Sequence, residues 1–170
     1  MVRWAALVKH GPVLDVASGA GRHARFFAER NLAVVAVDRQ PQSIPGVKFV
    51  QADLEDGSPW PFPGERFGAI VVTNYLHRPL LPMIGASLGA SGVLIYETFM
   101  IGNERYGKPS NPDFLLRPGE LLEAFAELTP IAFEQGTVEL LCEHSFVADL
   151  GEWDVGEPVS GGVNDLYRDL

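Results

Sequence analysis

The stretch Val13-Leu14-Asp15-Val16-Ala17-Ser18-Gly19-Ala20-Gly21-Arg22-His23-Ala24 decides the fold of this chain. Its first four residues form a run that is apolar on both faces apart from one carboxylate, which is typical of a buried parallel strand. Gly19 and Gly21 allow a tight turn and let a ligand approach bare backbone. The helix that follows presents unpaired N–H groups to that ligand. The stretch therefore predicts a nucleotide-type cofactor site at the carboxyl end of the first strand.

The composition indicates one globular domain. The chain has 170 residues, of which 46% are hydrophobic, so a single core of ordinary size is expected. We assign the domain to residues 1–156 and expect residues 157–170 to form a flexible tail. The single cysteine excludes an internal disulfide and favours a reducing, cytoplasmic setting. The sequence has no uninterrupted apolar run of roughly 18 residues, so no membrane helix is expected.

The charge is unevenly spread along the chain. The formal net charge is −9. Up to Pro118 there are 12 basic and 10 acidic residues, whereas from Gly119 onward there are 1 and 12. General nucleic-acid binding relies on cationic surface, so this balance argues against it. The acidic part is most simply a solvated surface.

Strands alternate with helices after the first strand. Buried strands are expected at 32–37, 47–51, 67–73 and 92–98, and helices at 3–9, 22–30, 80–88 and 118–128. Residues 131–141 suggest two strands that form a hairpin around Gln135-Gly136. The alternation predicts an α/β fold, a Rossmann-like three-layer sandwich around a mostly parallel sheet. Right-handed crossovers then place the polar residues that end the strands along one edge of the sheet.

These strand-end residues carry the expected chemistry. Asp38 follows the second strand at the place where a carboxylate binds ribose hydroxyls. Asp53-Leu54 follows the third strand, where a side chain and a backbone N–H can read an adenine edge. Asn74-Tyr75-Leu76-His77 follows the fourth strand and faces the reacting end of the ligand. Asp15 discriminates between cofactors, because its carboxylate would repel a pyrophosphate but attract an ammonium or sulfonium group.

With these motifs the chain resembles the class I S-adenosylmethionine-dependent methyltransferases. Val-Leu-Asp-Val-Ala-Ser-Gly-Ala-Gly looks like their first motif, with Ala17 where many members have Gly, and the residues around Asp38 and Asp53 look like the second and third. The resemblance implies a sheet of about seven strands with the last antiparallel, and S-adenosyl-L-methionine as cofactor. The small tellurite-resistance-type and related small-molecule methyltransferases are the most similar subgroup. The implied and expected cofactor-binding residues are Asp15, Ala17, Gly19, Gly21, Arg22, Asp38, Arg39, Asp53, Leu54, Asn74, Tyr75 and Leu76.

In methyl transfer by in-line displacement, the protein mainly aligns the acceptor and removes its proton. The candidate residues for the acceptor side are His77, Tyr75, Glu97 and Tyr106. His77 could act as a general base or simply pack at a strand end. Glu97 either pairs with an arginine such as Arg117 or faces the substrate.

Residues 100–117 form a long segment that is rich in Gly, Pro and Asn. They form either a lid over the acceptor or a connector docked by Phe114 and Leu115.

Two other functions stay open beside methyl transfer to a small molecule. One is an NAD-dependent oxidoreductase of the same layout, although Asp15 and the lack of a Tyr-x-x-x-Lys pair argue against it. The other is a non-catalytic cofactor-binding module, which would carry an acceptor side plugged by apolar side chains. No metal site is expected, because His10 and His144 have no spacing typical of metal ligands. The oligomeric state cannot be read from the sequence.

Overall fold

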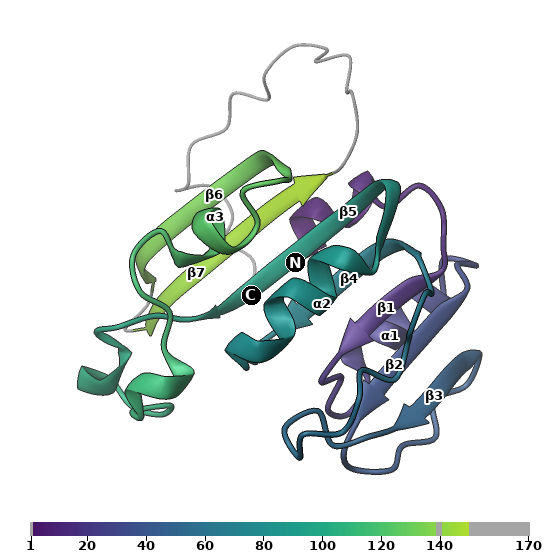
Figure 1. Ribbon diagram of the computed structural model, residues 1–170, viewed down its shortest axis with the longest axis horizontal. Helices are drawn as coiled ribbons and strands as arrows, with labels where there is room; N and C mark the ends of the chain where they lie inside the picture. Colours follow the sequence, from purple (N-terminus) through teal and green to yellow (C-terminus); the bar gives the residue numbers. More distant parts are fainter. Residues whose placement is uncertain (1, 139–140, 150–170) are drawn as a thin grey trace.

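Seven strands form one sheet in the computed structural model, which describes residues 2–138 and 141–149 (Figure 1). The expected tail, residues 157–170, lies outside the described residues. The strands are β1 (Val13–Val16), β2 (Val34–Asp38), β3 (Val47–Gln51), β4 (Phe67–Thr73), β5 (Leu88–Phe99), β6 (Thr129–Val138) and β7 (Leu141–Asp149). The helices are α1 (Arg22–Ala28), α2 (Leu81–Ala86) and α3 (Glu120–Ala124), with 3₁₀ turns η1 (Val2–Leu7), η2 (Arg78–Leu80), η3 (Asn103–Arg105) and η4 (Pro112–Phe114).

The strand order β3-β2-β1-β4-β5-β7-β6 confirms the predicted fold class. Strands β1 to β5 pair in parallel, and β7 is antiparallel to both β5 and β6. The strand order reverses between β1 and β4, because β1 pairs with β2 on one side and with β4 on the other. In open α/β sheets a ligand binds in the crevice at such a reversal, outside the carboxyl ends of the strands.

Each parallel strand sends alternate side chains to two different cores. Leu14 of β1 and Tyr96 of β5 belong to a cluster with α2 and α3, whereas Val13 and Ile95 belong to a cluster with α1 and η1. Figure 1 shows α2 and α3 in front of the sheet and the purple N-terminal segment behind it. The strands are therefore apolar on both faces because helices cover both faces.

Several expected elements differ in extent from those observed. The hairpin predicted around Gln135-Gly136 is wrong, because β6 runs through these residues and Gly136 pairs with Glu143 of β7. The expected helices at 80–88 and 118–128 are shorter than predicted, and the expected strand at 92–98 begins earlier, at Leu88. The expected helix at 3–9 is a 3₁₀ turn.

Loops without a helix connect β2 to β3 and β3 to β4. In the second loop, the Trp60 ring contacts Phe62 edge to face, with centroids 5.3 Å apart, and Phe62 contacts Phe67 of β4 in the same way at 5.5 Å. These rings cover the α2 side of the sheet. The Trp60 indole N–H donates to Ser87 Oγ at 3.0 Å. Among the described residues, the helices are all too short or too polar to cross a membrane.

Candidate cofactor site

A cavity of about 300 Å³ opens at the carboxyl ends of β1, β2 and β3. It is lined by Ala17, Asp38, Arg39, Ala52, Asp53, Leu54, Glu55, Tyr75 and Phe114. Six of these residues were expected to bind a cofactor, and the strand order brings them together from separate parts of the chain. A second hollow of about 700 Å³ shares four of these residues and extends along β3 toward Trp60. We place the cofactor in the smaller cavity, because only that cavity reaches the glycine turn through Ala17.

The turn after β1 is fastened to β2 through Asp38. The Gly19 N–H donates to Asp38 Oδ2 at 2.8 Å, and the Gln40 N–H donates to Oδ1 at 2.9 Å. A carboxylate has about four acceptor positions, so two remain for ligand hydroxyl groups. The expected role of Asp38 in holding a ribose is therefore compatible with its contacts inside the protein.

The site has open space and an unpaired polar atom of the kind that a cofactor can use. A Cβ added at Gly19 would meet no atom within 4 Å, so the backbone there lies open to a ligand. The buried Ser18 Oγ makes no hydrogen bond to another described residue. Buried polar atoms are normally paired, which favours partners supplied by a ligand. The residues present thus fit S-adenosylmethionine.

Asp15 has a different position from the one expected for a cofactor contact. Its side chain is 1% exposed and does not line the cavity. Its Oδ2 accepts the Ala24 N–H at 2.8 Å, which fastens the first turn of α1 to β1. Burial raises the pKa of Asp15 to about 7, although the Ala24 hydrogen bond and the nearby Arg22 act in the opposite direction. The carboxylate therefore holds the glycine turn and α1 in place.

His23 and Thr73 form a polar pair beneath the glycine turn, outside the cavity lining. The His23 Nδ1 lies 3.0 Å from Thr73 Oγ1, and the Arg22 Nε donates to His23 Nε2 at 3.2 Å. Because arginine only donates, His23 carries its proton on Nδ1 and donates it to Thr73. Burial and the adjacent Arg22 lower the pKa of His23 to about 4, so the ring is neutral at neutral pH.

Two residues in the site adopt left-handed backbone conformations. Ala17 has φ 52° directly after β1, and Asn74 has φ 53° directly after β4. Such conformations cost a residue with a Cβ about 1–2 kcal/mol and cluster at functional sites. The resemblance placed Ala17 where many family members have glycine, and the positive φ gives the physical reason for that preference.

The four acceptor-side candidates do not gather in one place. Tyr75 lines the cavity, and burial raises its pKa, as does the neighbouring Glu55 carboxylate, so the hydroxyl stays protonated at neutral pH. His77 and Glu97 are partly buried and are not among the lining residues. Tyr106 borders a separate hollow of about 300 Å³ beside η3 and β6. Arg117, the suggested partner of Glu97, instead lies with its Nε 3.5 Å from Glu120.

Other residues expected to bind cofactor are not among those that line this cavity. Leu76 is 3% exposed and belongs to the core. The side chain of Arg22 is engaged with His23, and the Asn74 N–H donates to the Glu97 carbonyl. Gly21 is buried beneath Ile44.

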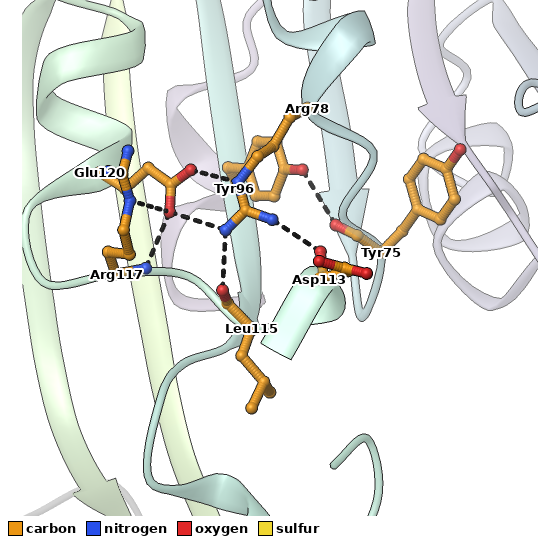
Figure 2. Close-up of polar contacts among 7 residues, drawn as sticks. All are labelled: Tyr75, Arg78, Tyr96, Asp113, Leu115, Arg117 and Glu120. Atoms are coloured by element: carbon orange, nitrogen blue, oxygen red, sulfur yellow. Dashed lines mark hydrogen bonds and ion pairs between the residues drawn. The ribbon is translucent and has the colours of Figure 1, made fainter. Parts of the chain in front are cut away.

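Residues 100–117 are docked against the sheet in this structure. The two ends of the segment lie side by side, because the Ile101 N–H donates to the Leu116 carbonyl at 2.9 Å and the Leu116 N–H to the Phe99 carbonyl at 3.0 Å. Leu115 and Leu116 are buried. Arg78 donates to main-chain carbonyls of the segment and to Glu120, as Figure 2 shows. These contacts are those of the docked connector that we weighed against a lid.

Comparisons with known proteins agree with the fold. Residues 14–79 match a family model described as "Methyltransferase domain". No curated protein matches the chain. Among solved structures, TehB from Haemophilus influenzae superposes with a TM-score of 0.70 at 16% identity, over 87% of this chain and 60% of TehB. The chain thus spans less than two thirds of the length of TehB.

Two further solved structures share the fold. A TehB-like SAM-dependent methyltransferase from Corynebacterium glutamicum gives a TM-score of 0.61 at 20% identity, covering 85% of each chain. The 1,6-didemethyltoxoflavin-N1-methyltransferase from Burkholderia thailandensis, solved with its toxoflavin precursor and S-adenosylhomocysteine, gives 0.60 at 22%, covering 89% of this chain and 76% of that one. The domain match covers the first strands and the glycine turn, and these solved structures share the fold of the chain.

Within the described part of the chain, His, Cys, Asp and Glu side chains do not gather in any group of three or more that could hold a metal ion.

Proposed function

We propose that this chain transfers the methyl group of S-adenosylmethionine to a small-molecule acceptor by in-line displacement. The observation that carries the proposal is the cavity in which Asp38, Asp53 and Leu54 meet beside the open backbone of Gly19. The similar Burkholderia protein is a methyltransferase of the compound 1,6-didemethyltoxoflavin, which supports an acceptor of small size. No second domain that could hold a macromolecular substrate is present among the described residues.

The residues of the chain have separate tasks in this proposal. Asp38 accepts hydrogen bonds from the ribose, and the region of Asp53 and Leu54 holds the adenine. The bound cofactor supplies an electrophilic methyl group. Tyr75 is a protonated hydroxyl at neutral pH, so it orients a ligand by hydrogen bonding and does not serve as a base. His77, at the start of η2, remains our candidate for removing an acceptor proton.

Calorimetric titration with S-adenosylmethionine, S-adenosylhomocysteine and NAD tests the cofactor assignment. We expect wild-type protein to bind both sulfur compounds and not NAD. Asp38→Ala should lose this binding, whereas Glu65→Ala, which removes an exposed carboxylate outside the cavity lining, should keep it. Binding of NAD alone would overturn the proposal in favour of an oxidoreductase. Binding of none of the three would favour a module that has lost its cofactor.

The small-molecule class is tested separately by transfer of a radiolabelled methyl group. Incubation with a panel of small amines, thiols, hydroxylated aromatics and metalloid oxyanions should label at least one low-mass product. Label found only in added protein or nucleic acid would contradict the proposed acceptor class while leaving the cofactor assignment intact.

A further inference from the structure

Arg78 connects the loop after β4 to the segment before α3. It lies three residues beyond Tyr75 and opens η2. Its guanidinium donates from Nη1 to the Asp113 carbonyl at 2.7 Å and from Nη2 to the Leu115 carbonyl at 2.9 Å. The same group pairs with Glu120 through Nε at 2.6 Å and Nη2 at 3.0 Å. All three nitrogens of the fork are thus used in one fixed arrangement (Figure 2).

Glu120 holds this fork in place. Its side chain is 5% exposed, and its Oε2 also accepts the Arg117 N–H at 2.8 Å. Burial by itself would raise the pKa of Glu120, but the hydrogen bonds from Arg78 and from the Arg117 backbone outweigh it and lower that pKa. The carboxylate is therefore charged at neutral pH and keeps the guanidinium in a single orientation.

Phe114 lies between the two carbonyls that Arg78 binds. Phe114 lines the cofactor cavity together with Ala17, Leu54 and Tyr75, and 44% of it is exposed. The neighbouring residue on its C-terminal side, Leu115, is buried. Hydrogen bonds to the carbonyls on both sides fix the backbone of Phe114, while the residue itself stays 44% exposed beside the cavity.

Tyr75 is held in the same way. Its carbonyl accepts a hydrogen bond from the buried Tyr96 hydroxyl at 2.9 Å. Figure 2 shows the Tyr75 ring pointing away from the Arg78–Glu120 pair. Two aromatic side chains of the cavity are thus fixed through their backbones, and their rings are available to a ligand. Aromatic surfaces of this kind suit a planar ligand group.

We propose that Arg78 is a positioning residue for ligand binding, which acts by holding Phe114 as an aromatic wall of the cofactor cavity. This inference rests on the proposed function, because it takes the ligand of the cavity to be S-adenosylmethionine and its product. Lysine cannot replace Arg78, since one ammonium group cannot reach two carbonyls and a carboxylate with the geometry of the fork.

A double-mutant cycle tests the proposal. Binding of S-adenosylhomocysteine is measured by calorimetry for wild type, Phe114→Ala, Arg78→Met and the double variant, and urea unfolding is measured in parallel. We expect about tenfold weaker binding in each single variant and no further weakening in the double variant. Arg78→Met and the double variant should both be less stable than Phe114→Ala, so that stability and affinity separate. Arg105→Met, which removes an exposed arginine of the same segment, is the matched control and should bind as wild type does.

The conservative variant Arg78→Lys covers the case in which Arg78→Met does not fold. Arg78→Lys keeps the charge and the aliphatic stem, and it should still bind S-adenosylhomocysteine about tenfold more weakly than wild type. Adding Arg78→Lys to Phe114→Ala should not weaken binding further. Additive losses in the cycle, or unchanged binding by both Arg78 variants, would overturn the role of Arg78 and leave the proposed function standing. A wild-type protein that does not bind S-adenosylhomocysteine would overturn the proposed function and this inference with it.

Discussion

The two glycines of the turn after β1 have different physical roles. Both have positive φ, 53° at Gly19 and 72° at Gly21. A Cβ at Gly19 would enter open space, whereas a Cβ at Gly21 would overlap the Cδ1 methyl of Ile44. Gly19 therefore belongs to the ligand side of the turn, and Gly21 belongs to the packing of α1 against the β2–β3 loop.

Alanine substitutions should separate these two roles. Gly19→Ala should cost only the strain of its backbone conformation, about 1–2 kcal/mol, and should weaken S-adenosylhomocysteine binding at least tenfold. Gly21→Ala adds overpacking of about 1–3 kcal/mol to the same strain, so its loss of stability should be the larger. Urea unfolding and calorimetry on both variants provide the comparison. Equal losses of stability would show that Ile44 moves aside without cost.

Asp15 and His23 give the stability of the protein opposite dependences on pH. The folded-state pKa of Asp15 is raised from 3.8 to about 7, so the stability associated with its protonated form is lost as pH rises across that interval. The folded-state pKa of His23 is lowered from 6.5 to about 4, so the stability associated with its neutral form is lost as pH falls across that interval. Between about pH 4 and pH 6.5 the two effects offset each other.

Asp15→Asn should expose the effect of His23. The amide oxygen can still accept the Ala24 N–H, so the fold is kept. The free energy of unfolding should then rise with pH between 4 and 6.5, by up to roughly 1.4 kcal/mol per pH unit. His23→Gln should show the opposite slope, falling as pH rises from about 4 to 7. Urea titrations at half-unit pH intervals measure both slopes, and parallel profiles for the two variants would contradict the assignment.

At the scale of the element, the sequence predicts best where one pattern has one structural meaning. The buried strands and the turn at Gly19 were found because an apolar run followed by small residues at the carboxyl end of a strand has few other structural solutions. The hairpin prediction at Gln135-Gly136 failed, because glycine is typical of a turn but Gly136 pairs with Glu143 within the β6–β7 ladder. The hydrogen bonds of Arg78 to Glu120 and to the Asp113 carbonyl could not be predicted, since these partners lie 42 and 35 positions away and no local pattern links them.

The start of α3 depends on the Glu120 carboxylate, which leads to a pH-dependent prediction. The folded-state pKa of Glu120 lies below its ordinary value of 4.5. The contribution of Glu120 to the free energy of unfolding is therefore present above pH 4.5 and is lost as pH falls through the folded-state pKa. Glu120→Gln should lower the free energy of unfolding by about 1–3 kcal/mol at pH 7, because Arg78 loses its charged partner.

This loss should shrink as pH falls below about 4.5, because Glu120 in the unfolded chain takes up a proton there while folded Glu120 still resists it. The matched control is Glu123→Gln, an exposed carboxylate on the same helix, which should change stability by less than about 0.5 kcal/mol. Urea unfolding at pH 7 and pH 4 measures the difference. A loss of the same size at both pH values would mean that packing at Glu120, and not its charge, supports α3.

At the scale of the whole molecule, the cofactor cavity joins parts of the chain that are distant in sequence. Asp38 ends β2, Ala17 and Leu54 come from the turns after β1 and β3, Tyr75 follows β4, and Phe114 comes from the segment before α3. A ligand that contacts all of these walls stabilises the folded state alone, by about 2.7 kcal/mol at a concentration one hundred times its dissociation constant.

Binding should therefore protect both sides of the cavity at once. We expect S-adenosylhomocysteine to slow amide hydrogen exchange in residues 17–21 and also in residues 112–117, and to raise the urea midpoint in a single cooperative transition. Phe114→Ala should keep the protection of the glycine turn and lose that of the second segment, because Phe114 is the residue of that segment that lines the cavity. If wild-type protection were confined to the glycine turn, the ligand would contact only the β1–β3 side, and Phe114 would not be a wall of the bound site.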